Sequence, residues 1–171
     1  RLALSGYVMT DSNKYRAVDA WLSNPAAAEA TYGHISTWET GGGRDMSRLF
    51  RGASSFNEDI GAWDTSGVKS MRSMFDFALR FNRDISGWAV HSVTNMGWMF
   101  SGTSDSATAF NQDIGDWAVQ SVKDMPYMFD SASAFNRDIG DWAVHSVTDM
   151  TVMFCDASAF HEDTGGGAGQ S

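Results

Sequence analysis

The sequence of 171 residues has a single cysteine, two prolines and few basic residues. Because Cys155 stands alone, an intrachain disulfide and a cysteine-based metal cluster are excluded. Lys and Arg number 12 against 21 Asp and Glu, and the formal charge is −9. This balance argues against a duplex nucleic-acid partner, since phosphate binding needs clustered basic side chains. No apolar run approaches the ~20 residues of a membrane-spanning helix, so we expect no membrane span.

Signatures of catalysis are also missing. No Ser/His/Asp or Cys/His constellation recurs, and no glycine-rich phosphate loop follows a strand pattern. The apolar fraction of 43% and the charged fraction of 19% exclude a disordered chain. We therefore expect a folded protein that is not an enzyme and that needs no cofactor for catalysis.

The sequence does contain a repeat. The motif Phe-Asn-x-Asp-Ile recurs at spacings of 25, 29 and 25 residues, and an altered copy follows after a further 25. The copies begin at Phe56, Phe81, Phe110, Phe135 and Phe160. Residues 110–134 and 135–159 are identical at 18 of 25 positions. An earlier copy without Phe-Asn is marked by Ile35, Trp38, Met46 and Phe50, which fall in the same register.

This repeat predicts the fold class. A single copy of 25 residues buries too little apolar surface to offset its ordering entropy, whereas stacked copies share their faces. We predict an α/β repeat solenoid over residues 32–164, with about five turns and a degenerate end. Each turn is expected to hold a short parallel strand at Phe-Asn-x-Asp-Ile and a short helix at Met-x-x-Met-Phe. Four extra residues within 101–106 predict a surface loop.

The two ends depart from the repeat. Residues 1–31 predict an N-terminal helical cap, with one helix from Asp11 or Ser12 to about Ser23 and a second from Pro25. Such a cap would hide the open face of the first turn. Residues 165–171 are rich in glycine and predict a flexible tail.

The run FNRDIGDWAVHSVTDMTVMF over residues 135–154 resembles a repeat family of bacterial and algal surface proteins. These proteins are BspA-like relatives of the leucine-rich repeats, and the resemblance covers about residues 31–164. It implies a leucine-rich-repeat-like solenoid at the cell surface or outside the cell, which binds something or builds a surface layer. The family has no known common catalytic residues, so the resemblance assigns none here.

One acidic column could bind metal. Asp59, Asp84, Asp113 and Asp138 occupy the same position of successive repeats. Neighbours ~4.8 Å apart in a parallel stack repel by about 3.5 kcal/mol at an effective dielectric of ~20. Such a column needs either cations or hydrogen-bond donors. The two interpretations are a divalent metal site, most plausibly for calcium, and a set of turns that each Asp orders by accepting backbone N–H groups.

Two further columns favour structural roles. The Asn residue after each initial Phe predicts an asparagine ladder, in which its side chain bonds the backbone of the next turn. The tryptophans keep register with Ile and Val, which predicts a buried row rather than an exposed sugar-stacking surface. These are Trp38, Trp63, Trp88, Trp117 and Trp142.

A variable column suggests a partner site. The position between the paired methionines is occupied by Arg48, Ser73, Trp98, Tyr127 and Val152. If it faces outward, Trp98 and Tyr127 form an aromatic patch on adjacent turns; the alternative is packing against the loop at 101–106. We expect a non-catalytic binding or adhesion module whose partners are proteins or glycans on a surface. The alternative is a structural unit that assembles with copies of itself through its ends into a filament or coat.

Overall fold

The regular elements of the protein lie near its N-terminus. The structure, a computed structural model, describes residues 6–161. Its elements are β1 (Val8–Thr10), α1 (Lys14–Ser23), α2 (Pro25–Tyr32), the short 3₁₀ helix η1 (Ile35–Thr37) and β2 (Glu39–Gly42). Strands β1 and β2 pair in parallel. The predicted flexible tail and the end of the predicted repeat region lie outside the described residues.

Both helices that were predicted near the N-terminus are present. Helix α2 has Pro25 in its first turn, and the Asn24 side chain accepts the Ala27 N–H at 3.1 Å. Helix α1 begins at Lys14, later than predicted, because the Asp11 carboxylate is bonded elsewhere. Within α1, Trp21 is buried. In the described part of the chain, no helix combines the length and the apolar character that crossing a membrane requires.

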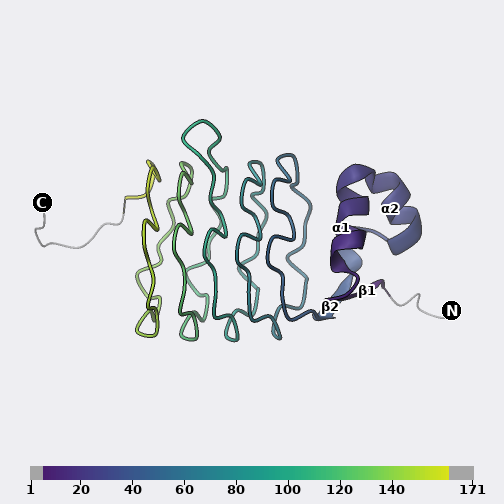
Figure 1. The fold of residues 1–171 in the computed structure, drawn as a ribbon, viewed down its shortest axis with the longest axis horizontal. Helices are drawn as coiled ribbons and strands as arrows, with labels where there is room; N and C mark the ends of the chain where they lie inside the picture. Colours follow the sequence, from purple (N-terminus) through teal and green to yellow (C-terminus); the bar gives the residue numbers. More distant parts are fainter. Residues whose placement is uncertain (1–5, 162–171) are drawn as a thin grey trace, which may run out of the picture.

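Successive repeats lie side by side in chain order (Figure 1). Parallel backbone bridges connect the residue before the first Met of each repeat to its counterpart in the next. These bridged residues are Asp45, Ser70, Asn95, Asp124 and Asp149. Beyond this point, N–H groups of alternate residues donate to carbonyls of the next repeat, as Met46 does to Ser70 and Arg48 to Arg72, both at 2.9 Å. The fold is therefore a mixture of short helices and parallel pairing between repeats.

The predicted helix and strand within each repeat are both wrong. In residues 43–161 the structure has turns and isolated bridges but no helix. The Met-x-x-Met-Phe segment cannot continue as a helix, because alternate N–H groups bond the next repeat and the variable position is left-handed. Its φ values at Arg48, Ser73, Trp98, Tyr127 and Val152 lie between 54° and 62°. The parallel pairing thus falls on this segment and not on Phe-Asn-x-Asp-Ile.

The core is a large aromatic cluster in register with the repeats. The Phe of each Met-x-x-Met-Phe segment, or of its counterpart that ends at Phe50, stacks on the Phe that begins the next copy, with centroids 3.8–4.3 Å apart. Equivalent Phe rings of neighbouring copies lie 5.4–6.1 Å apart. The Trp column is buried, as predicted. Each of its members from Trp63 to Trp142 donates its indole N–H to the Ile carbonyl of the preceding repeat, as Trp88 does to Ile60 at 3.1 Å. The loop over residues 101–106 projects beyond its neighbours (Figure 1).

Candidate functional site

The Asp column orders turns within its own repeats. Each of these carboxylates accepts the N–H of the residue two positions later, at 2.9–3.1 Å. The four pairs are Asp59 with Gly61, Asp84 with Ser86, Asp113 with Gly115, and Asp138 with Gly140. The hydrogen bonds from Ser86 lower the pKa of Asp84, because they stabilise the charged carboxylate. This geometry matches the second interpretation of the column, in which each Asp orders a turn by accepting a backbone N–H group.

Two members of the column line the same cavity. Asp113 and Asp138 line a shallow cavity of about 200 Å³ together with Gly115, Asp116 and Asp141. Within residues 6–161, however, no group of three or more His, Cys, Asp or Glu side chains is placed to hold a metal ion. Calcium binding by the column stays a prediction, and the hydrogen bonds account for these carboxylates without it.

The asparagine ladder is confirmed. The side-chain oxygen of each Asn accepts the N–H of its counterpart in the next repeat, at distances from 2.9 to 3.1 Å. The accepting residues are Asn57, Asn82, Asn111 and Asn136, and the last donor is the N–H of His161. These bonds connect the repeats along the Phe-Asn-x-Asp-Ile segments. Among the described residues, these segments are not joined by a ladder of backbone hydrogen bonds like the one at Met-x-x-Met-Phe.

The structure brings together the two aromatic residues of the variable column. The rings of Trp98 and Tyr127 stack with centroids 5.1 Å apart and an interplanar angle of 8°. The Arg72 guanidinium lies 4.7 Å from the Trp98 ring centroid. Both rings are half-buried, in contrast to the buried tryptophan column. Because Arg72 comes from the preceding repeat and Tyr127 from the following one, the indole is held between them.

The repeats belong to a known family. The sequence matches the family model described as "Mycoplasma protein of unknown function, DUF285" over residues 22–106 and again over residues 102–167. The chain belongs to the DUF285 family. No curated protein and no solved structure matches it. The two DUF285 matches meet at the inserted loop, and the relation to the BspA-like leucine-rich repeats stays a prediction.

Beside the aromatic pair, this DUF285 chain has a polar groove that the sequence analysis missed. It measures about 140 Å³ and is lined by Arg48, Arg51, Arg72, Ser73, Asp76 and Trp98. The signal was present, because Arg48, Ser73 and Trp98 share one column while Arg51 and Asp76 share another, 25 residues apart. When each column is considered separately, the sequence does not predict that three arginines from neighbouring repeats line one groove.

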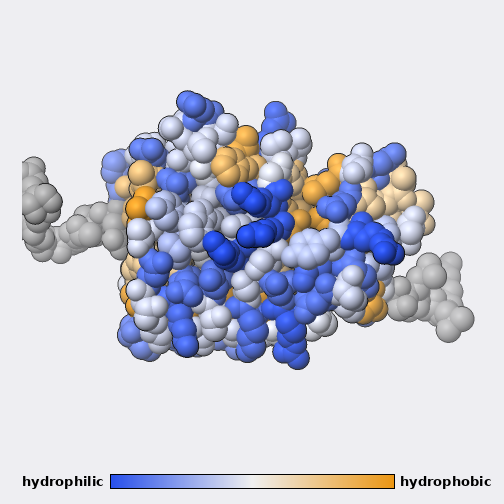
Figure 2. Space-filling model, viewed as in Figure 1, coloured by the Kyte–Doolittle hydropathy of each residue, from blue (hydrophilic) through white to orange (hydrophobic). Residues whose placement is uncertain are grey.

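The last described repeat of the DUF285 chain has an exposed apolar face. Val144 and Met150 are 36% and 41% exposed, whereas their counterparts Val119 and Met125 are 1% and 0% exposed. Together with Trp142, they line an apolar groove of about 260 Å³. Figure 2 shows apolar side chains at this end, on the left of the view. The described C-terminal end therefore presents residues that are core elsewhere in the molecule.

Proposed function

We propose that this DUF285 chain is a non-catalytic binding module that acts at the cell surface or outside the cell. Its architecture on this proposal is an α/β solenoid related to the leucine-rich repeats. The support is the one-to-one register of the repeats: equivalent residues bond each other across every junction, through the backbone and through the asparagine ladder. A solenoid presents equivalent positions as continuous outer surfaces, which suits recognition of an extended partner.

The observation that carries this proposal is the stacked pair of Trp98 and Tyr127. Each ring sits at a position of the repeat that is occupied by five different residue types in five copies, while the flanking methionines are buried. Large aromatic side chains held in a fixed orientation are the usual anchors of binding interfaces, since they lose little entropy on binding. The pair is positioned like an anchor and does not fill the core.

A binding screen tests the proposal. The wild-type chain, immobilised on beads, is exposed to arrays of purified glycans and extracellular-matrix proteins, alongside the double variant Trp98→Ser/Tyr127→Ser. Serine suits this position because Ser73 already adopts the same left-handed backbone there. Leu22→Ser, which also removes an exposed apolar side chain, serves as the matched control. We expect the double variant to lose the ligands that Leu22→Ser retains; a wild-type chain with no ligand in either array would overturn the proposal.

A second candidate function is self-assembly into an array, and the apolar C-terminal groove favours it. The opposite end of the repeats, however, is covered by α1 and α2 (Figure 1), so among residues 6–161 the first repeat does not offer a matching open face for head-to-tail stacking. Pairing of two C-terminal ends would give dimers and not filaments. Sedimentation across a wide concentration range separates the candidates: a strictly monomeric chain removes self-assembly, and growth beyond dimers supports it.

A further inference from the structure

The polar groove beside Trp98 concentrates positive charge on an acidic protein. Arg48, Arg51 and Arg72 are all exposed side chains that line it, although the whole chain carries a formal charge of −9. The arginines come from two successive repeats, and Trp98 comes from the third. Three of the chain's 12 basic residues therefore meet in one small concavity.

One of these charges is neutralised and two are not. Arg51 donates its Nε–H to Asp76 at 2.9 Å, and the other oxygen of that buried carboxylate accepts the Ser101 hydroxyl at 2.7 Å. Within residues 6–161, Arg48 and Arg72 have no carboxylate partner. Guanidinium groups remain charged at all physiological pH values, so these two repel each other unless an anion lies between them.

The groove is also organised before any ligand arrives. The ring of Trp98 lies against Arg72 on one side and Tyr127 on the other, which restricts the rotamers of Arg72 and Trp98. The buried carboxylate of Asp76 restricts Arg51 by accepting a hydrogen bond from it. A guanidinium held in one orientation binds a planar or tetrahedral oxyanion through paired hydrogen bonds at a reduced entropic cost.

We infer that this groove, lined by Arg48, Arg51 and Arg72, binds the carboxylate or sulfate group of an acidic sugar. This inference rests on the proposed binding function and names its ligand class. The lining favours a sugar because it is polar throughout apart from Trp98, with a serine hydroxyl and guanidinium donors for sugar hydroxyls. An apolar pocket for a peptide side chain is missing from this groove. A long polyanion such as nucleic acid meets repulsion from a chain whose formal net charge is −9.

Isothermal titration of the purified chain tests the inference with defined probes. The probes are a galacturonate tetrasaccharide, a heparin-derived sulfated tetrasaccharide, neutral cellotetraose, a hexa-aspartate peptide and an oligothymidylate. We expect at least one acidic sugar to bind more tightly than the other three probes, with an affinity that falls as salt rises. Failure of both acidic sugars to bind overturns the inference, and so does equal or tighter binding of the peptide or the oligothymidylate.

Matched variants locate the site. Arg48→Gln and Arg72→Gln should each weaken binding of the acidic sugar about tenfold, since each removes a charge-assisted contact. Arg16→Gln makes the same charge change on an exposed residue of α1 and should leave the affinity unaltered. Arg72→Lys, which keeps the charge but loses the planar fork, should give an intermediate affinity. An equal loss in all three glutamine variants would overturn the assignment to this groove.

The same variants separate this inference from the proposed function. If Trp98→Ser/Tyr127→Ser loses an array ligand that Arg48→Gln and Arg72→Gln both retain, the module binds but its ligand is not anionic. That result overturns the acidic-sugar site and leaves the binding function standing. If the wild-type chain has no array ligand and no acidic sugar binds, both fail together. Unfolding midpoints of all variants, measured alongside, identify any loss that arises from misfolding.

Discussion

The two ends of the repeat region are completed in opposite ways. At the N-terminal end, Tyr7, Trp21 and Tyr32 pack edge-on against Trp38 with centroids 5.3, 6.2 and 6.1 Å from it. At the described C-terminal end, Trp142 has one aromatic neighbour among residues 6–161, Phe129, at 6.4 Å. Equivalent tryptophans of the same repeat unit thus have very different surroundings, because α1 and α2 cover one end and no described element covers the other.

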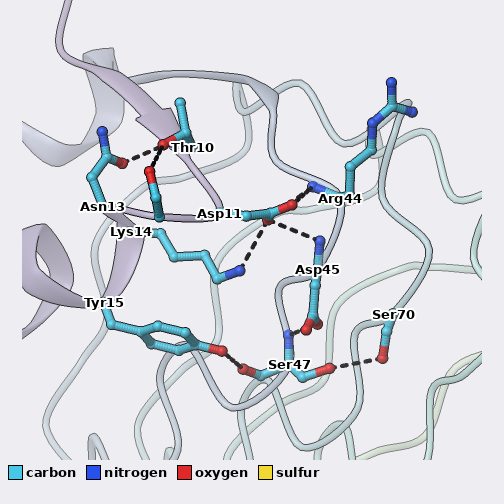
Figure 3. A network of polar contacts seen from close by, with 10 residues as sticks. Thr10, Asp11, Asn13, Lys14, Tyr15, Arg44, Asp45, Ser47 and Ser70 are labelled. Carbon is cyan, nitrogen blue, oxygen red and sulfur yellow. Dashed lines mark hydrogen bonds and ion pairs between the residues drawn. The ribbon is translucent and has the colours of Figure 1, made fainter.

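Polar groups show the same contrast. The Asp11 carboxylate accepts the N–H groups of Arg44 and Asp45 and the Lys14 ammonium, and the Tyr15 hydroxyl donates to the Ser47 carbonyl at 2.7 Å (Figure 3). At the other end, alternate N–H groups of the last repeat have no acceptor within the described residues. These are the N–H groups of Met150, Val152, Phe154 and Asp156.

The contrast in polar groups follows from the direction of the backbone hydrogen bonds between repeats. From the first Met of each repeat to the Phe four residues later, N–H groups of the earlier copy donate to carbonyls of the later one. Just before that Met the direction reverses, as when the Lys69 N–H donates to the Arg44 carbonyl at 2.7 Å. Along the Met-x-x-Met-Phe segment, the first repeat therefore presents carbonyls at its outer edge, and the last described repeat presents N–H groups. Side chains of the N-terminal cap, such as Tyr15, supply donors to the carbonyl edge. Along this segment two C-terminal edges would meet donor against donor, so a segment that covers it must bring carbonyls in parallel register.

The strongest test of the comparison replaces the same residue at each end. Trp38→Ala should lower the free energy of unfolding by about 3–5 kcal/mol, because it opens a cavity between the cap and the first repeat. Trp142→Ala should cost clearly less, since its site borders the apolar groove and can collapse. Urea unfolding, followed by tryptophan fluorescence and by amide exchange, measures both. Equal costs would show that the described C-terminal end is as well packed as the capped one.

Two valines at the same repeat position allow a similar test with a smaller change, in which one methyl group is replaced by a hydroxyl. Val119→Thr buries an unpaired hydroxyl in the interior and should destabilise the chain by about 1–3 kcal/mol. Val144→Thr, at the same repeat position but 36% exposed, should change stability by no more than about 0.5 kcal/mol. If the two substitutions cost the same in urea, Val144 is buried in solution, which would mean that another segment or molecule covers this end.

These contrasts also show what sequence reasoning could reach. The buried Trp column, the asparagine ladder and the second helix were predictable, because each depends on strict periodicity or on a local capping residue. The aromatic pair was predictable as a juxtaposition, since Trp98 and Tyr127 share one repeat position. The columns and the aromatic pair follow from the register of the repeats, and the second helix follows from its local capping residue.

The structure within each repeat could not be reached in this way. Met-x-x-Met-Phe has the i, i+3, i+4 spacing of a helix face, but the same spacing fits a turn with a left-handed residue between the methionines. Which of the two forms depends on whether its N–H groups find acceptors inside the segment or in the next repeat. The arginine groove was missed for a related reason, because it joins residues from different columns of three repeats.

Acid should affect the two ends in opposite senses. Burial alone would raise the pKa of Asp11, but the Lys14 ammonium and the N–H groups of Asp45 and Arg44 lower it overall. Its stabilising contribution is therefore complete above the unfolded pKa of about 3.9 and is lost as the pH falls through the folded value. Burial raises the pKa of Asp130 near the other end, so protonation there relieves a cost as the pH falls toward 4.

Variants separate these two contributions. Asp11→Asn should destabilise the chain by about 1 kcal/mol at neutral pH, through weakened hydrogen bonds, and should flatten the loss of stability below pH 4. Asp130→Asn should remove the gain that occurs on moving from pH 6 toward 4. Thermal melts at several pH values measure both effects. The same pH profile in Asp11→Asn and the wild type would show that the cap does not depend on this carboxylate.

The smallest expected effect concerns calcium along the Asp column. Each Asp already accepts an N–H of its own turn, and the described carboxylates form no group of metal ligands, so calcium and a chelator should give the same unfolding midpoint. Asp113 and Asp138 are the most informative positions for detecting calcium, because they line one cavity and lie nearer the uncovered C-terminal end of the described repeats. Amide exchange there, with calcium and with chelator, should be identical. Slower exchange confined to these turns in calcium would establish the metal site that the column predicted, and Asp138→Asn should then abolish the effect while Asp59→Asn, near the capped end, should not.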